Sequence, residues 1–211
     1  MARKLRDNWL MMALVAGLGL AYVVLLGYLL LGNLLGLKAE ATGASVSPAV
    51  VPVGLWDAHD QALEAAQAQT ADAQLVSAST HWRAASESAL RNGAGSWTFV
   101  FYSPSSEHSL DVVARDGVAR VVNQTPAWVV PSNIAEGSWQ EGPEDATLAF
   151  LACGGRAFLD QHPHAAVDLH LAGDGHGGTA WTVVALDAGE RSLFSVVVDA
   201  GTGEVLSTDL S

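Results

Sequence analysis

Hydrophobic residues first form one long run near the start of the chain. Residues 9–37, from Trp9 to Leu37, contain no charged side chain. A helix needs about 20 apolar residues to cross a bilayer, and in lipid it satisfies every backbone amide within itself. The run therefore predicts one transmembrane helix that exceeds the minimum length.

A cleaved signal peptide is the alternative interpretation of this run. Its apolar region would span about 7–15 residues and end at a small-x-small cleavage site. The run is longer and ends in Gly36-Leu37-Lys38-Ala39-Glu40, which lacks that pattern, although Ala41-Thr42-Gly43-Ala44 offers a late site. We expect a retained signal anchor.

Basic residues flank the run unequally. Arg3, Lys4 and Arg6 precede it, whereas only Lys38 follows closely. Because positive residues stay on the cytoplasmic side, residues 1–8 are predicted to be cytoplasmic. The rest of this single-pass cell membrane protein would then be extracytoplasmic.

Beyond the run, the apolar pattern switches between the periods of helices and strands. Small residues with Pro48 and Pro52 predict a linker at 38–56. A helix is expected at 57–69, a turn or short helix at 84–95, and strands at 74–83, 97–102, 108–115 and 118–123. A connector at 126–142 precedes a helix at 144–161 and strands at 165–172, 179–187, 192–199 and 204–207.

The same order of elements occurs twice. A shift of 84 residues aligns 97–122 with 181–206 without a gap, gives seven identities in 26 positions, and places Trp97 on Trp181. We therefore predict an α+β fold, in which the transmembrane helix precedes two helix-plus-antiparallel-sheet units at 57–125 and 143–211. The alternative is two unrelated hairpins.

The end of the second unit resembles the closing hairpin of PepSY-type domains. A strand there runs into Asp199-Ala200-Gly201-Thr202-Gly203 and then Glu204-Val205-Leu206. Ala180-Trp181-Thr182-Val183-Val184 resembles the family's Trp/Tyr-x-Val strand. The resemblance covers 143–208 well and 57–123 more loosely, where Asp116-Gly117 replaces the turn.

This resemblance implies small α+β (PepSY/cystatin-like) modules outside the membrane with a binding or inhibitory role. It supplies no catalytic residue. Asp199, Thr202 and Gly203 are interpreted as structural, because aspartate caps a turn and glycine accepts a positive φ.

Charge narrows the range of partners. From Lys38 onward the chain carries seven basic and 21 acidic residues, a net charge of −14. Such a domain is unlike nucleic-acid binders, which present a basic face, and anionic lipid would repel it. Solubility explains the charge most simply, and a basic partner surface is the alternative.

Candidate chemistry is sparse. The lone Cys153 lies in an apolar run and is expected to be buried. His162, His164, His170 and His176 fall within fifteen residues, but their spacing matches no metal-binding signature, so exposed loop positions are the simpler interpretation. No nucleophile or zinc-protease motif is present. We therefore expect that the protein is not an enzyme and that it binds no cofactor and no metal.

The leading hypothesis is a non-enzymatic, membrane-tethered extracytoplasmic binding or regulatory module that recognises a protein or peptide. One alternative is an accessory structural subunit of a larger membrane protein complex, packed through Gly32 and Gly36 of the apolar run. The other is a metal-binding extracytoplasmic domain that uses the four histidines.

Overall fold

The first half of the chain that the structure describes folds as a helix followed by strands. The computed structural model describes residues 52–135, 137–174 and 177–211. Its first elements are helix α2 (Leu55–Gln67), strand β1 (Gln74–Trp82), short helix α3 (Glu87–Arg91), and strands β2 (Ser96–Ser103), β3 (His108–Arg115) and β4 (Val118–Pro126). The predicted strands are present here: β3 has the predicted bounds, and the ends of the others shift by one to three residues.

The second half begins with a helix that is interrupted. Helix α4 (Pro143–Phe150) continues through a π-helical turn (Leu151–Gly155) into α5 (Arg156–Gln161). Strands β5 (Ala166–Gly173), β6 (Thr179–Asp187), β7 (Ser192–Asp199) and β8 (Val205–Leu210) follow. The helix predicted over 144–161 is therefore present, but it is bent within its glycine pair.

Small residues let α2 lie close to the sheet. Ala58, Ala62 and Ala66 recur every four residues on its inner face and are fully buried. The helix begins after Gly54, and Asp57 lies in its first turn. There the carboxylate interacts favourably with the positive end of the helix dipole.

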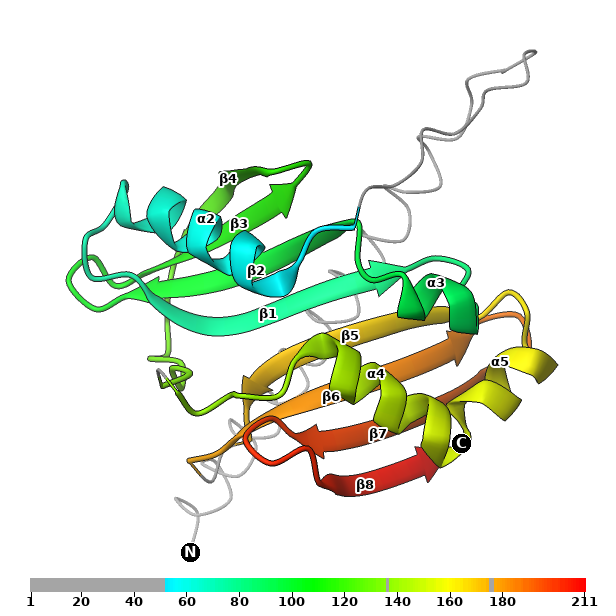
Figure 1. Cartoon of the computed structure of the whole chain (residues 1–211). Coiled ribbons are helices and arrows are strands. Elements are labelled where there is room, and N and C mark those ends of the chain that lie inside the picture. Colours follow the sequence, from blue (N-terminus) through cyan, green and yellow to red (C-terminus); the bar gives the residue numbers. More distant parts are fainter. Residues whose placement is uncertain (1–51, 136, 175–176) are drawn as a thin grey trace, which may run out of the picture. The chain divides into compact units, whose positions relative to one another are not determined.

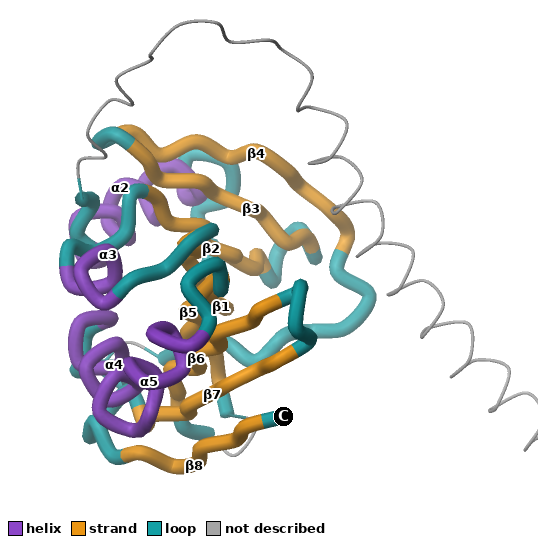
Figure 2. The backbone as a smooth tube through the Cα atoms, turned by 90° about the vertical axis from the view of Figure 1, so that its right-hand side faces the viewer, coloured by secondary structure: helices purple, strands orange, loops and turns teal. Residues whose placement is uncertain are grey.

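All strands of the described residues belong to one eight-stranded antiparallel sheet in the order β4-β3-β2-β1-β5-β6-β7-β8 (Figure 1). β1 and β5 meet at its centre, where Ala78 pairs with Leu171, Thr80 with Leu169 and Trp82 with Val167. The helices all cover one face of this sheet (Figure 2).

The predicted fold class, a transmembrane helix followed by two helix-plus-antiparallel-sheet units, is therefore wrong, because all described strands form one sheet. Separate sheets would leave β1 and β5 as edge strands with unpaired backbone groups. Their antiparallel pairing satisfies those groups and merges the sheets. The boundaries proposed for the two units stay a prediction.

The predicted single-pass architecture and cell-membrane location are also corrected. Across the described ranges, the structure contains no helix that is both long and apolar enough to cross a membrane. The helix predicted at 9–37 lies outside the described residues, as do the predicted cytoplasmic segment at 1–8 and Gly32 and Gly36.

The core lies between the sheet and its helices. Trp97, Phe99 and Phe101 on β2 and Trp181 on β6 project into it and are at most 1 % exposed. The opposite face of the sheet is polar at its centre, where Thr98, Ser79, His170 and Thr182 form one row across four strands.

Two buried tryptophans hold the starts of the main helices. The indole Nε1 of Trp97 donates to the carbonyl oxygen of Val53 at 3.1 Å, two residues before α2 begins. Nε1 of Trp181 donates to Glu141 at 2.9 Å, two residues before α4 begins. The centroids of the two rings lie 6.3 Å apart. On each side of the central strand pair, an indole hydrogen bond thus holds the segment that leads into a helix.

Gly154 and Gly155 in the second helix pack closely against aromatic rings. A Cβ on Gly155 would lie 2.4 Å from the buried ring of Phe150, and Gly154 has a φ of 122° with Phe194 beside it. The neighbouring Cys153 is exposed, contrary to our expectation. It lies on the outer side of the π-helical turn, where the changed helical period moves it away from the core.

Replacing Gly155 with alanine should destabilise the fold by about 1–3 kcal/mol, because a buried aromatic ring must move to admit the methyl group. Chemical denaturation of Gly155→Ala measures this change. Gly54→Ala is the matched control, since its Cβ would meet only an ordinary contact at 3.7 Å. Equal stabilities of the two variants would contradict the packing described.

Candidate functional site

A groove of about 460 Å³ runs along one side of α2. His59, Leu63 and Gln67, spaced by four residues, form its helical wall. Its floor is the start of β1 at 73–75, and the opposite wall comes from the connector at 133–135 and Trp139. One wall is thus a helix and the other an irregular segment.

Backbone hydrogen bonds fix the connector that forms the second wall. The amide of Ile134 donates to Leu75 of β1 at 2.8 Å. The amides of Gln140 and Glu141 both donate to the carbonyl oxygen of Ala200, in the turn after β7, at 2.8 and 2.9 Å. The connector is therefore bonded to both halves of the sheet.

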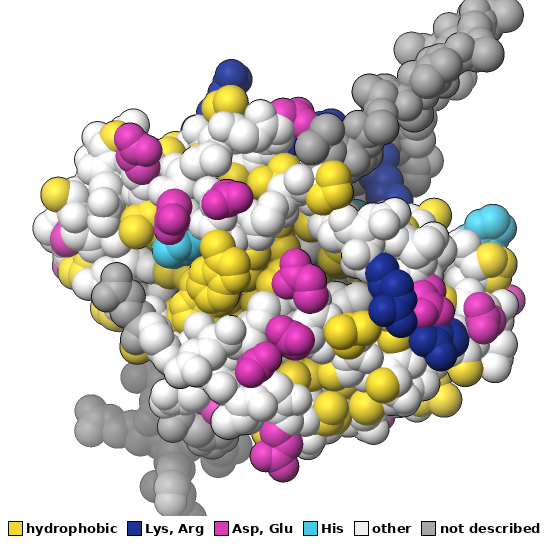
Figure 3. All heavy atoms as spheres, viewed as in Figure 1, with side chains coloured by type: hydrophobic (Ala, Val, Ile, Leu, Met, Phe, Trp, Pro, Cys, Tyr) yellow, Lys and Arg dark blue, Asp and Glu magenta, His cyan; other side chains and the backbone are white. Residues whose placement is uncertain are grey.

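Stacked tryptophans form an apolar surface at the end of this groove. The rings of Trp56 and Trp139 are stacked, with centroids 4.4 Å apart and planes inclined by 27°. Trp139 is buried, but Trp56 is 48 % exposed. The ring of His59 meets Trp139 edge-on at 5.6 Å. Hydrophobic side chains gather at this place between α2 and α4 (Figure 3).

The elements around the tryptophans carry negative charge. On α2, Asp57, Asp60 and Glu64 are exposed, and Glu144 and Asp145 are exposed in the first turn of α4. Neither helix contains lysine or arginine. Acidic side chains accordingly surround the apolar surface in Figure 3.

Asp72 holds the turn that leads into the groove floor. Its carboxylate accepts hydrogen bonds from the Ser103 hydroxyl at 2.6 Å, and from the Ser105 amide and hydroxyl at 2.7 and 2.9 Å. These bonds, led by that from Ser103, hold the pKa of Asp72 below its ordinary value. The aspartate thereby ties the α2–β1 turn to the β2–β3 hairpin.

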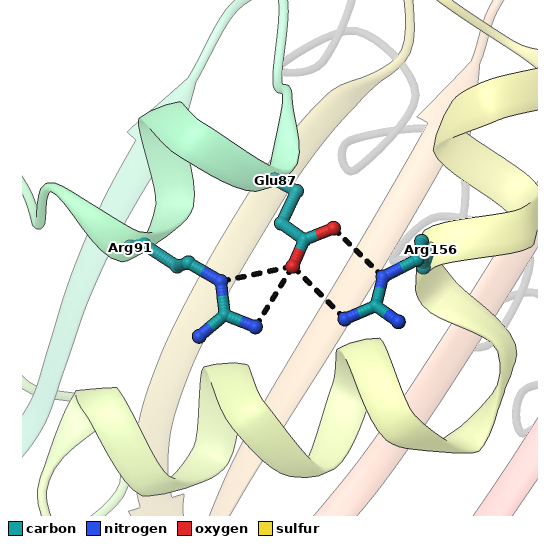
Figure 4. A network of polar contacts seen from close by, with 3 residues as sticks. All are labelled: Glu87, Arg91 and Arg156. Atoms are coloured by element: carbon teal, nitrogen blue, oxygen red, sulfur yellow. Dashed lines mark hydrogen bonds and ion pairs between the residues drawn. The ribbon is translucent and has the colours of Figure 1, made fainter.

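A carboxylate between two arginines bridges the helices of the two halves (Figure 4). Glu87 of α3 accepts from Arg156 of α5 at 2.7 and 2.9 Å, and from Arg91 at 2.8 and 2.9 Å. Arg156 first and Arg91 second lower the pKa of Glu87. Because all three side chains are at least a third exposed, this network contributes only modestly to stability.

The four histidines of the metal hypothesis do not gather as a group among the described residues. His162 ends α5, His164 is exposed beyond it, and His170 lies in the middle of β5. His176 lies outside the described residues. His162 instead approaches two carboxylates, those of Asp187 and Glu190, at 3.4 and 3.0 Å.

A larger hollow of about 730 Å³ lies where β1 ends and β2 and β5 begin. Nδ1 of His81 lies 2.7 Å from the Asp168 carboxylate there, and both side chains are about half exposed. Arginine, serine and backbone groups form much of the remaining lining. Trp82 also lines this hollow, but among the described residues it has no stacked aromatic partner of the kind that Trp139 provides for Trp56.

Sequence reasoning missed Trp56, Asp187 and Glu190. Trp56 carried a signal, since it lies outside the four-residue repeat of Ala58 and Ala62 that marks the inner face of α2. No sequence pattern indicated Asp187 and Glu190, because their turn meets the end of α5 only after the sheet has formed.

Comparison with known proteins finds a family model that matches part of the second half. Residues 156–209, from α5 to β8, match the family model of PepSY, the peptidase propeptide and YPEB domain. This segment is therefore similar to PepSY domains. The match confirms the resemblance drawn from the Asp199 turn, while the first half lies outside the matched residues.

A solved structure resembles more of the chain. A predicted lipoprotein from Clostridium difficile 630 is 12 % identical, with a TM-score of 0.42, and the alignment covers 72 % of this chain and 92 % of that one. No curated protein matches the chain. The PepSY match is thus the finding that bears on function.

Replacing Asp72 with asparagine should reduce stability most at neutral pH. A carboxyl whose folded pKa is depressed stabilises above its unfolded pKa of about 3.9, and this contribution is lost as pH falls through the folded value. Denaturation of wild type and Asp72→Asn between neutral and acid pH should show the difference closing below about pH 4. Asp209→Asn, on exposed β8, is the matched charge control. A difference that stays constant with pH would contradict this role.

Proposed function

We propose that this protein is a non-enzymatic binding module that recognises a peptide segment of a partner protein along α2. The segment would carry an apolar or aromatic residue flanked by lysine or arginine. The observation that carries this proposal is the half-exposed Trp56, stacked on a buried Trp139 and surrounded by carboxylates.

The tryptophan pair supports an anchor role because it is both apolar and held in place. Large aromatic residues dominate binding energy at interfaces, especially when little side-chain freedom is lost on binding. Stacking on Trp139 already restrains Trp56. An incoming apolar side chain would cover the exposed part of that ring.

The surrounding charge supports a basic partner segment. Carboxylates on both α2 and α4 border the apolar surface, and neither helix has a compensating cation. Complementary charge accelerates encounter and excludes acidic competitors. Because these carboxylates are exposed, salt should weaken the interaction.

The PepSY match supports binding over catalysis. Domains of this family are propeptide-like and generally non-catalytic, and such a domain fits an extracytoplasmic module. We further propose that residues 57–125 are a diverged second unit of this kind. Its support is the repeated order of elements and the matching bonds of Trp97 and Trp181.

Trp56→Ala should weaken peptide binding by about ten-fold or more, as expected for a central aromatic anchor. A random peptide array probed with the purified full-length protein would select basic segments that contain an apolar residue. Fluorescence titration of the best peptide then compares variants at about 50 and about 500 mM salt.

Trp128→Ala is the matched control, because Trp128 is 95 % exposed and lies apart from the stack. Trp56→Phe should retain most of the affinity if the ring itself is the anchor. Failure of the array to select any peptide, or equal losses in Trp56→Ala and Trp128→Ala, would rule out this surface.

A further inference from the structure

One imidazole and two carboxylates converge at the end of α5. His162 is the residue that ends this helix, and its ring packs on Phe158 with centroids 4.3 Å apart. Its backbone amide donates to Phe158 at 2.9 Å, and its carbonyl accepts from Ala165 at 2.9 Å. The imidazole is therefore held by contacts on both its ring and its backbone.

The first carboxylate is oriented by its own turn. Oδ1 of Asp187, the last residue of β6, accepts from the amides of Gly189 and Glu190 at 2.9 and 3.2 Å. Those bonds leave Oδ2 facing His162. The backbone hydrogen bond from Glu190 is the main cause that lowers the pKa of Asp187, which keeps it ionised at neutral pH.

The spacing of the three groups is that of ligands around a small cation. Nδ1 of His162 lies 3.0 Å from Oε2 of Glu190 and 3.4 Å from Oδ2 of Asp187, and the three candidate ligand atoms lie within 4.8 Å of one another. Two ligands about 2.1 Å from a tetrahedral zinc ion would lie about 3.4 Å apart.

One nitrogen of the His162 imidazole also lacks an aligned hydrogen bond. Nδ1 of His162 is buried, and it has no partner in hydrogen-bonding geometry despite the two nearby oxygens. A buried ring nitrogen that lacks an aligned hydrogen bond is costly, and a cation between the three groups would satisfy it. The side chains of His162 and Asp187 are only 12 % and 13 % exposed, so these two ligands are shielded from water, whereas Glu190 is 64 % exposed.

We propose that His162, Asp187 and Glu190 bind one divalent transition-metal ion, with zinc the best fit. One imidazole nitrogen and two carboxylate oxygens suit zinc, whereas calcium and magnesium favour oxygen ligands alone. Three protein ligands leave a fourth position for water. The ion would link the end of α5 to the β6–β7 turn, apart from the groove along α2, so this site is independent of peptide recognition.

Zinc titration of the tag-free, metal-stripped full-length protein tests the site. Calorimetry should give one zinc ion per chain, and zinc should raise the Tm. Glu190→Gln should weaken zinc binding about ten-fold or more, while His162→Gln should abolish the one-to-one site. Glu204→Gln, an exposed glutamate in the β7–β8 turn, has the same charge change and should bind zinc as wild type does.

Glu190 is 64 % exposed, so its replacement should leave the metal-free Tm unchanged even if His162→Gln fails to fold. Absence of stoichiometric zinc binding up to about 100 μM would overturn the site. Equal zinc affinities of Glu190→Gln and Glu204→Gln would do so too, and would assign the cluster to an ion pair between His162 and its two carboxylates.

Discussion

The pairing of β1 with β5 is the interaction on which the rest of the described structure depends. Its six residue pairs place two strands from distant parts of the chain at the centre of one sheet. Without it, each half would expose an edge strand and one side of its core. With it, Trp97 and Trp181 lie 6.3 Å apart beneath a shared layer of helices, and each binds the segment that leads into its own helix.

The surface beside α2 follows from the same pairing. The connector can bond to Leu75 of β1 and to Ala200 after β7 only when both halves belong to one sheet. Those bonds place Trp139 beneath Trp56. The proposed recognition surface is therefore assembled from both halves, although the PepSY match covers only 156–209.

Local pattern was sufficient to predict the strands but not their assembly. The alternation of apolar residues located β3, β6 and β7 at their observed bounds, because each has one buried face. The joining of β1 to β5 depends on which strand edges have unpaired backbone groups. Side-chain periodicity does not show which edges these are. For the same reason, the approach of His162 to Asp187 and Glu190 could not be predicted, since a helix end and a distant turn form it. Glycine inside a helix is costly unless close packing requires it, and Gly154 and Gly155 meet that condition.

Native-state hydrogen exchange tests the central claim, that one continuous sheet unites both halves. If the sheet is continuous, amides in β2 and β6, on opposite sides of the central pair, exchange through the same global unfolding and share one free energy and one denaturant dependence. Amides of Ala78 in β1 and Leu171 in β5, which are paired at the centre, should belong to this most protected group. Exchange of β5–β8 through a separate, lower-energy opening while β1–β4 stay protected would contradict the account.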